Sequence, residues 1–543
     1  MSMRSWRPAT AIIAVASLLL ALVACGSKDS DASQAASAYA AAFARQDVEA
    51  SAAMTSSPSQ AADALSETFA GMHPRTVDTQ VLDVVDYSDG SATFTLKVTW
   101  HWAGDKEFTD RTTGSVRRLS TGWKVQWDTG LIHSGMPVGG HLEMTREDAD
   151  PAPTVRAASG KPLMRVIPIN DLVINPEGTK NLRKSVKQLT DAIAPVAPLV
   201  TATVIDQKIR DNKGGETVAV SLRDSDLKRL TADPNGIAGV SVRKSSQLVM
   251  TDRRIDTPLE AGLTNYWEAI RDAIAGWQVV LVVPGQPTQK LTGTDGTPGP
   301  DVMSTVDMDE QLDLQEAVAM VAQPATIMTF DAKSGAIRGM ANNQAASDKN
   351  IGADISYPTG TTLDPVFAAV DGATAGKGPD APNDQLGHLG LDLQLTVPGV
   401  SAPHDVTAQI RTADFKPQNF TASILNMGAL GISIARSIDH STDTAPPFVV
   451  RGATTKAEGG TLGGVDPAAA KKIADAMKTT AATGDASDIK GAPGLRALVG
   501  TNGPKGPGWF VGITGGGRVV VIYCENERSG TAALQVAQKY FRP

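Results

Sequence analysis

Two apolar runs late in the sequence, Gly508-Trp-Phe-Val-Gly-Ile-Thr514 and Arg518-Val-Val-Val-Ile-Tyr-Cys524, are typical of buried β-strands. Two further strands are expected at Ala325–Phe330 and Gly335–Met340, on either side of a short turn. Helices are expected at 312–321, 420–438, 467–480 and 530–540. Because strands from both ends of this segment can share one sheet with helices between them, residues 306–543 are predicted to form an α/β sandwich.

Upstream, the stretch Thr93-Phe-Thr-Leu-Lys-Val-Thr-Trp100 alternates polar and apolar residues with a period of two, which predicts a strand buried on one face. Similar segments surround it: a helix is expected at 33–48, and strands at 79–87, 91–102, 108–119 and 123–127. Together they predict a small, cone-like α+β domain over residues 36–148. The stretch Asp148–Pro153 is expected to be a linker.

Residues 154–305 lack the density of apolar residues that one large core requires. Short strands are expected at Val200–Ile205 and Val218–Val220, and a helix at Leu263–Ala275. The Gly-, Pro- and Thr-rich run Pro284–Pro300 closes the region. We therefore expect an extended, mixed linker domain here, and a multidomain α+β fold for the chain.

The composition excludes several classes of protein. The chain has 543 residues, which suggests three or four domains at roughly 150 residues each. Its 50 Lys+Arg and 58 Asp+Glu give a net charge of −8, so nucleic acid is not an expected partner. Two cysteines and seven scattered histidines without an HExxH motif argue against a disulfide scaffold, a four-cysteine zinc site and a metalloenzyme. No cofactor is expected.

The first segment indicates the compartment. Two arginines precede an apolar run from Ala11 to Ala24, which is short for a membrane span of about 20 residues. The small residue before Cys25 is typical of a lipoprotein cleavage box, so residues 1–24 are predicted to be a signal peptide and Cys25 to carry a lipid. The alternative is an ordinary secretory signal in which Cys25 is incidental. With a flexible tether at 25–35, the protein is expected on the extracytoplasmic face of the membrane, and Cys524 is predicted to be a buried strand thiol.

The order of these parts resembles the class B penicillin-binding proteins, the transpeptidases that cross-link peptidoglycan, in a lipoprotein form. Four stretches carry the resemblance. Trp123–His133 resembles the end of a nuclear-transport-factor-like domain, and Val306–Gln315 resembles the start of a transpeptidase domain. Phe330–Met340 resembles the first hairpin of that domain, and Gly508–Gly512 resembles its late central strand. The resemblance implies a nuclear-transport-factor-like domain at 36–148, a dimerisation-like domain at 154–305 and a β-lactamase-type transpeptidase domain at 306–543.

Transpeptidases of this family use three clusters, S-x-x-K, S-x-N and K-[ST]-G. The expected position of the first cluster is Tyr357-Pro-Thr-Gly-Thr-Thr-Leu-Asp-Pro-Val366, with Thr361 in place of the serine and Asp364 in place of the lysine. Threonine keeps a hydroxyl, but an ordinary carboxylate, with a pKa of about 3.9, is a poor base for an alcohol. The structural alternative is a helix cap, in which Thr361 and Asp364 form a pattern like a capping box.

The other two clusters are also altered. No serine lies between Ser356 and Ser401, and no later serine is followed two positions on by asparagine, so the S-x-N cluster is missing. The expected position of the third cluster reads Arg496-Ala-Leu-Val-Gly-Thr-Asn502. There Leu498 replaces the lysine, whereas Gly500 and Thr501 match the family pattern. The apolar Leu498 is expected in the core or along the cleft.

A few isolated patterns lie outside these positions and are interpreted as chance matches: Ser225-x-x-Lys228, Ser241-x-x-Lys244 and Lys333-Ser334-Gly335. The first two precede the sandwich, and the third lies in an expected hairpin turn. Trp100 and Trp102 share one strand face and are expected to pack within the sheet.

Where a nucleophile and a base act as a unit, removing either costs roughly a millionfold in turnover, and here both are replaced. The sequence therefore favours a non-catalytic relative, a pseudo-transpeptidase that binds or scaffolds during peptidoglycan assembly. By the resemblance, its partners are peptidoglycan stem peptides or active cell-wall synthases, together with the membrane. Two alternatives stay open: an active D,D-transpeptidase that reacts with β-lactams, and a ligand-binding or sensory lipoprotein.

Overall fold

The structure is a computed structural model that describes residues 30–284, 286–400, 419–441, 445–501 and 506–542. The expected signal peptide and Cys25 lie outside the described residues. Two compact units divide the chain: unit 1 is Met1–Asp148 with Gly276–Gly296, and unit 2 is Ala149–Ala275 with Thr297–Pro543. Within the described part of the chain, every helix is too short or too polar to span a membrane.

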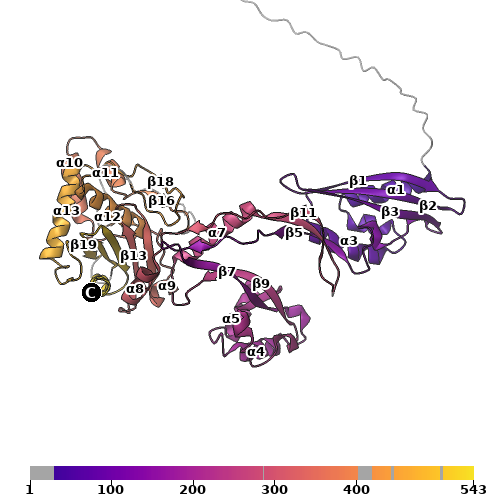
Figure 1. Cartoon of the computed structure of the whole chain (residues 1–543), viewed down its shortest axis with the longest axis horizontal. Coiled ribbons are helices and arrows are strands. Elements are labelled where there is room, and N and C mark those ends of the chain that lie inside the picture. Colours follow the sequence, from indigo (N-terminus) through magenta and orange to yellow (C-terminus); the bar gives the residue numbers. More distant parts are fainter. Residues whose placement is uncertain (1–29, 285, 401–418, 442–444, 502–505, 543) are drawn as a thin grey trace, which may run out of the picture. The chain divides into compact units, whose positions relative to one another are not determined.

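A four-stranded antiparallel sheet, in the order β1-β2-β3-β4, forms the centre of unit 1, and helix α1 packs against all four strands (Figure 1). The elements are α1 (Asp31–Ala44), α2 (Val48–Ala53), α3 (Pro58–Met72), β1 (Thr76–Asp86), β2 (Ser91–His101), β3 (Glu107–Leu119), β4 (Gly122–Val125) and the short 3₁₀ helix η1 (Thr129–Leu131). The predicted helix and the four predicted strands are confirmed, with their ends moved by a few residues.

Strand β2 shows why this sheet forms. Its buried residues alternate along the strand: Ala92, Phe94, Leu96, Val98 and Trp100. The Trp100 ring centroid lies 5.6 Å from those of Phe43 in α1 and Phe69 in α3. One face of β2 therefore packs against the helices, and its other face is only partly exposed, in agreement with the alternation.

A three-stranded antiparallel sheet, in the order β11-β10-β5, completes unit 1. Its strands are β5 (His141–Glu147), β10 (Gly276–Val282) and β11 (Gln289–Thr294). Residues 276–296 lie inside the segment expected to be a linker domain, yet they pair with β5. Val279 and Leu281 of β10 are buried in the same core as Trp100, which explains why this hairpin belongs to unit 1.

The first part of unit 2 is built on a five-stranded sheet in the order β12-β6-β7-β8, with β9 paired to β7. The elements are β6 (Val155–Arg156), β7 (Pro162–Ile174), η2 (Pro176–Gly178), α4 (Leu182–Ile193), α5 (Ala202–Asp211), β8 (Thr217–Leu222), α6 (Asp224–Leu227), η3 (Pro234–Gly236), β9 (Val240–Met250), α7 (Leu259–Ile274) and β12 (Val302–Met303). The predicted strand at 218–220 and helix at 263–275 are confirmed as β8 and α7.

The strand expected at Val200–Ile205 is wrong, because helix α5 begins at Ala202. The Thr201 side chain caps this helix by accepting a hydrogen bond from the Val204 N–H. Ile205 and Ile209, one turn apart, are buried in a small core with α4 and β8. The spacing of four residues and the cap together outweigh the strand preference of the β-branched residues.

A five-stranded antiparallel sheet, in the order β14-β13-β21-β20-β19, organises the rest of unit 2. Helices α8 and α14 cover one face, and α12 and α13 cover the other (Figure 1). The elements are α8 (Met308–Val318), β13 (Ala325–Asp331), β14 (Ile337–Asn342), α9 (Gln344–Asp348), β15 (Tyr357–Pro358), α10 (Asp364–Thr374), α11 (Ala381–His388), β16 (Gln394–Thr396), β17 (Thr421–Ala422), α12 (Ile424–Ile438), β18 (Lys456–Glu458), α13 (Pro467–Ala482), β19 (Arg496–Thr501), β20 (Gly508–Ile513), β21 (Arg518–Cys524) and α14 (Ser529–Tyr540). The strands and helices predicted in this segment are confirmed.

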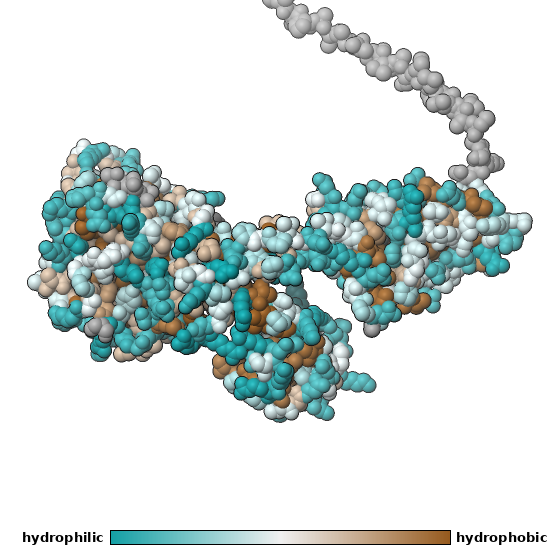
Figure 2. Space-filling model, viewed as in Figure 1, coloured by the Kyte–Doolittle hydropathy of each residue, from teal (hydrophilic) through white to brown (hydrophobic). Residues whose placement is uncertain are grey.

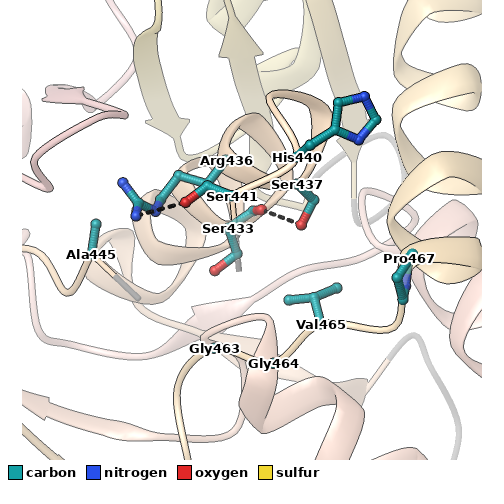
Figure 3. A pocket seen from close by; sticks show the side chains of 10 residues that line it. All are labelled: Ser433, Arg436, Ser437, His440, Ser441, Ala445, Gly463, Gly464, Val465 and Pro467. Atoms are coloured by element: carbon teal, nitrogen blue, oxygen red, sulfur yellow. Dashed lines mark hydrogen bonds between the residues drawn. The ribbon is translucent and has the colours of Figure 1, made fainter. Parts of the chain in front are cut away.

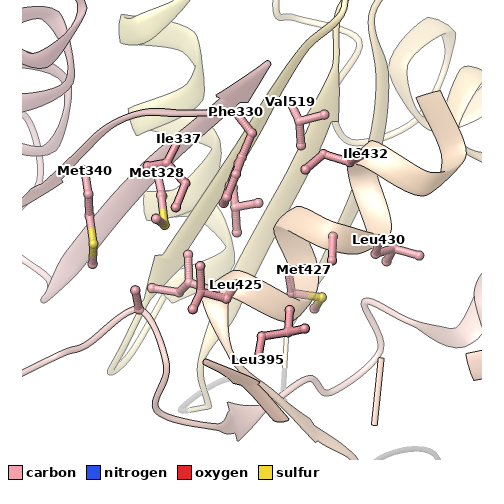
Figure 4. Close-up of a cluster of buried hydrophobic side chains, with 14 of the residues drawn as sticks. Met328, Phe330, Ile337, Met340, Leu395, Leu425, Met427, Leu430, Ile432 and Val519 are labelled. Carbon is pink, nitrogen blue, oxygen red and sulfur yellow. The ribbon is translucent and has the colours of Figure 1, made fainter. Parts of the chain in front are cut away.

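Helix α12 packs unusually closely on this sheet. Figure 4 shows its Ile432 beside Val519 of β21, with Phe330 of β13 next to them on the sheet. A Cβ atom on Gly428 would overlap the Phe330 ring, and Phe330 is fully buried and has no room to move. The glycine therefore sets the distance between the helix and the sheet.

We predict that Gly428→Ala destabilises the sheet core by about 1–3 kcal/mol, because the added methyl group cannot fit against Phe330. The matched control is Gly372→Ala in α10, where the new methyl group meets only the flexible end of the Lys472 side chain. This control is expected to be neutral or to stabilise by up to about 1 kcal/mol. Amide hydrogen exchange in α12 and β13 measures the difference, and equal protection in both variants would contradict the close packing.

Candidate functional site

The loop before helix α10 places Thr361 against the last residue of strand β19. The Thr361 N–H donates to the Thr501 carbonyl at 3.3 Å, and the Thr361 hydroxyl lies 3.3 Å from the same oxygen. The Thr501 N–H donates in turn to Thr361 Oγ1 at 3.3 Å. Two positions that are 140 residues apart in the sequence, each singled out by its motif, therefore meet in the structure.

Gly500 allows this close approach. A Cβ atom on Gly500 would lie 2.5 Å from Thr362 Cα, which is far closer than van der Waals contact allows. Thr362 directly follows Thr361 in the loop. Any other residue would push the strand away from the start of α10. The match of Gly500 to the family pattern thus has a packing reason that is independent of chemistry.

The amide groups around the Thr361 hydroxyl are already engaged. Acyl transfer requires N–H groups that point at the oxygen on which negative charge develops. Here the Thr361 N–H donates to the Thr501 carbonyl, and the Thr501 N–H donates to the Thr361 hydroxyl itself. In the described geometry, neither amide can hold a substrate carbonyl without first breaking a hydrogen bond within the protein.

Asp364 lies in the first turn of α10 and is exposed to solvent. The expected capping box of Thr361 and Asp364 is wrong, because Leu363 is the N-cap residue and no side chain caps the helix. The Thr361 hydroxyl faces β19 instead. Within the described residues, no hydrogen bond joins the Asp364 carboxylate to that hydroxyl, and a carboxylate at a helix N-terminus is stabilised by the helix dipole.

Leu498 lies two residues before Gly500 in β19, so both residues face the same side of the sheet. Its side chain is 2% exposed and belongs to the large core cluster of unit 2. Val511, its neighbour on β20, and Met477 of α13 belong to the same cluster. The position where the family pattern has a cation is therefore occupied by a core residue.

Three aromatic rings support the loop that carries Thr361. Tyr357 stacks on Tyr523 at 4.3 Å, and Trp509 lies 4.6 Å from Tyr523. The Trp509 Nε1–H donates to the Pro358 carbonyl at 2.9 Å. Burial raises the pKa of Tyr357 to about 12, so its hydroxyl stays protonated at neutral pH. The rings position the loop by packing and do not supply a base.

Ser423 and Asn426, which match none of the three family clusters, form a buried polar pair at the start of α12. They make a capping box: the Asn426 N–H donates to Ser423 Oγ at 3.0 Å, and the Ser423 N–H donates to Asn426 Oδ1 at 3.1 Å. The Asn426 side-chain amide also donates to the carbonyls of Gly390 and Leu393. The Ser-x-x-Asn spacing of a capping box was the signal that could have found them.

The comparison with protein families concerns unit 1. Residues 31–139 match the NTF2-like N-terminal transpeptidase domain. The matched stretch runs from α1 through η1 and contains the four-stranded sheet, so the chain has an N-terminal region like that of penicillin-binding proteins. It covers about a fifth of the sequence and identifies this domain rather than the whole protein. The comparison with curated proteins found no match.

The isolated motif matches lie outside residues 31–139 and outside the loop that carries Thr361. Ser241 and Lys244 lie on strand β9, where residues three apart point to opposite faces. Ser225 and Lys228 lie at the short helix α6. Ser334 lies in the turn between β13 and β14, where its hydroxyl bonds to an Asp331 carboxylate oxygen at 2.8 Å. These positions support the interpretation of chance matches.

Two other predictions concern packing. Cys524 is buried and free, as predicted, and burial raises the pKa of its thiol, so it is not a nucleophile at neutral pH. Trp100 is fully buried, and the Trp102 Nε1–H donates to the Met72 carbonyl at 2.6 Å, so both tryptophans pack within unit 1. Cys25 lies outside the described residues.

A cavity of about 220 Å³ lies at the C-terminal end of α12 (Figure 3). Two of its polar side chains are already hydrogen-bonded: Ser437 Oγ donates to the Ser433 backbone carbonyl at 2.8 Å, and Arg436 donates to Ser441 Oγ at 3.0 Å. Arg436 also donates to the Lys333 carbonyl, and a cation at a helix C-terminus is stabilised by the helix dipole. These contacts assign the cluster a structural role.

A larger cavity of about 480 Å³ lies between the start of α7 and the segment after β14. Its lining includes two carboxylates, Asp256 and Asp354, and the polar residues Asn342, Ser347 and Asn350. Its volume falls in the range of roughly 300–1,000 Å³ that is typical of small-molecule sites. It is separate from Thr361 and Thr501, which do not line it.

We predict that Leu498→Lys destabilises the protein by about 3 kcal/mol or more at pH 7, because it buries a cation in an apolar core. Burial lowers the pKa of that lysine, so the unfolded state binds more protons and the loss shrinks as pH rises toward about 10. The control Leu498→Met keeps the volume and should cost less than about 1.5 kcal/mol. Amide hydrogen exchange in β19, measured at pH 7 and at a higher pH, gives the stability of each variant. A Leu498→Lys variant that is as stable as Leu498→Met would show that Leu498 lines an open cleft.

Proposed function

We propose that the protein is a cell-envelope lipoprotein of the penicillin-binding-protein type that acts in peptidoglycan assembly without transpeptidase chemistry. The family match of residues 31–139 supports the relationship. The antiparallel sheet covered by helices on both faces supports a transpeptidase-like domain at 306–543. Peptidoglycan stem peptides or active cell-wall synthases are the proposed partners, and a lipid on Cys25 is the proposed link to the extracytoplasmic face of the membrane.

The observation that carries this proposal is the pairing of Thr361 with Thr501. A hydroxyl becomes a nucleophile when a base takes its proton, and the acyl oxygen needs free donors beside it. Among the described residues, the contacts of the Thr361 hydroxyl are with backbone atoms of Thr501, and both amides are engaged. The hydroxyl is held as a structural group.

The charges of the side chains at the site also support a non-catalytic role. Asp364 places a carboxylate where the S-x-x-K pattern has its lysine. The buried Leu498 occupies the position of the K-[ST]-G lysine, which would help to hold a substrate carboxylate. A substrate carboxylate about 4 Å from Asp364 would be repelled by roughly 4 kcal/mol at an effective dielectric constant near 20. The proposed role is therefore binding or scaffolding through other surfaces.

We predict that the full mature protein forms no covalent adduct with a fluorescent penicillin, because among the described residues the Thr361 hydroxyl contacts no base and both nearby amides are engaged. Intact mass after prolonged incubation at saturating drug measures this, with an active class B transpeptidase as the positive control. Thr361→Ala is the matched variant. A mass increase in the parent protein that disappears in Thr361→Ala would overturn the proposal and establish an active transpeptidase.

A second candidate function, ligand binding, is favoured by the 480 Å³ cavity beside α7. Its two carboxylates would suit a small molecule with a free amine. If this cavity binds no ligand, any thermal shift that millimolar D-alanyl-D-alanine produces is expected to be independent of the cavity. A shift that is lost in Ser347→Trp, which fills the cavity, would instead support the ligand-binding protein.

A further inference from the structure

Three large apolar or aromatic side chains are exposed at one end of the sheet in unit 1. Val85 is 50% exposed, Tyr87 is 51% exposed and Leu119 is 39% exposed. Tyr87 follows β1 in the turn to β2, and Leu119 ends β3 at the turn to β4. We call these three side chains the hairpin tip. Figure 2 shows apolar residues among hydrophilic ones on the surface of this domain.

The strand register places the hairpin tip on one face. Val85 lies opposite Thr93, and the Tyr87 hydroxyl bonds to Thr93 Oγ1 at 3.3 Å. Thr93 lies opposite Ser115, which is four residues before Leu119 in β3 and so on the same face. The two turns also touch, because the Arg118 N–H donates to the Gly90 carbonyl at 3.2 Å. This face is opposite to the one that packs against α1.

The hairpin tip lies beside the point where the described chain begins. The Ser30 hydroxyl donates to the Asp86 carboxylate at 3.1 Å, and Asp86 lies between Val85 and Tyr87 in the sequence. Ser30 is five residues after Cys25, a distance of at most about 18 Å even for fully extended chain. A lipid on Cys25 would therefore hold the hairpin tip close to the membrane.

We propose that the hairpin tip rests on the bilayer surface and orients the NTF2-like domain relative to the membrane. This inference rests on the lipid anchor of the proposed function. Tyrosine and aliphatic side chains favour the membrane–water interface, where the ring body is buried and the hydroxyl stays hydrated. One anchor restricts distance but not orientation, and a second contact beside it supplies the orientation.

The charges near the hairpin tip distinguish a bilayer from an anionic polymer as the occupant. Three carboxylates, Asp83, Asp86 and Asp89, lie in or beside the turn from β1 to β2, and two cations, Arg117 and Arg118, end β3. The tip thus has no excess of positive charge with which to attract phosphate groups. Apolar contact is the attraction that remains, so the binding is expected to persist in high salt.

The test uses the full mature, lipidated protein on phosphatidylcholine vesicles that contain a nitroxide-labelled lipid as quencher. A fluorescent label is placed at Leu119→Cys, and the matched control label at Ala103→Cys. Ala103 lies in the turn at the other end of β3, and the 13 residues of that strand span about 40 Å. Cys524 is buried and does not compete for the label. We expect several-fold stronger quenching at position 119 than at position 103.

Equal, weak quenching at both positions on protein that still sediments with the vesicles would overturn the inference and leave the anchor in place. Val85→Ser with Tyr87→Ser should reduce the quenching at position 119 to the control level, and unchanged quenching in this folded variant would also contradict the proposal. Mature-length protein that combines Cys25→Ser with Val85→Ser and Tyr87→Ser should be released from the vesicles. Retention of this variant, which lacks both the lipid and the apolar tip, would overturn the lipid anchor itself, by a measurement independent of the quenching.

Discussion

The close approach between the start of helix α10 and the last residues of strand β19 is the constraint on which the proposed role depends. Gly500 has no side chain because Thr362 occupies that space, and this proximity brings Thr361 and Thr501 into mutual hydrogen bonds. A site of this kind can be open and reactive only if its amides point outward. Here the same proximity that brings the two threonines together also engages both amides, and this is the basis on which we propose that the site does not carry out transpeptidase chemistry.

The groups that support this contact do not depend on transpeptidase chemistry. The loop is held by the Trp509 bond to Pro358 and by the aromatic stack, and neither depends on a nucleophile or a base. Leu498 adds apolar surface to the core at a position where a cation would need compensation. Active sites often retain groups that reduce stability, and replacing them commonly stabilises a fold. A protein selected for binding would be free to make such replacements.

Local pattern predicted much of the fold, and the failures have physical reasons. The alternation in β2 and the apolar runs of β20 and β21 were sufficient to predict these strands, because each strand buries a regular set of side chains. The run at Val200–Ile205 misled because a buried strand and a short amphipathic helix share apolar composition. The long strands β7 and β9 were missed, since their buried residues do not alternate regularly.

The site was predictable only in part. Thr361, Gly500 and Thr501 could be located by resemblance, but their hydrogen bonds join residues 140 positions apart, and no local pattern encodes them. The capping interpretation failed for that reason. A crystal structure of the mature protein at high resolution would show which groups contact the Thr361 hydroxyl. For a non-catalytic site, we expect this oxygen to contact the Thr501 backbone and no basic side chain. A lysine nitrogen within about 3 Å of it, beside a free backbone amide, would instead indicate an active transpeptidase.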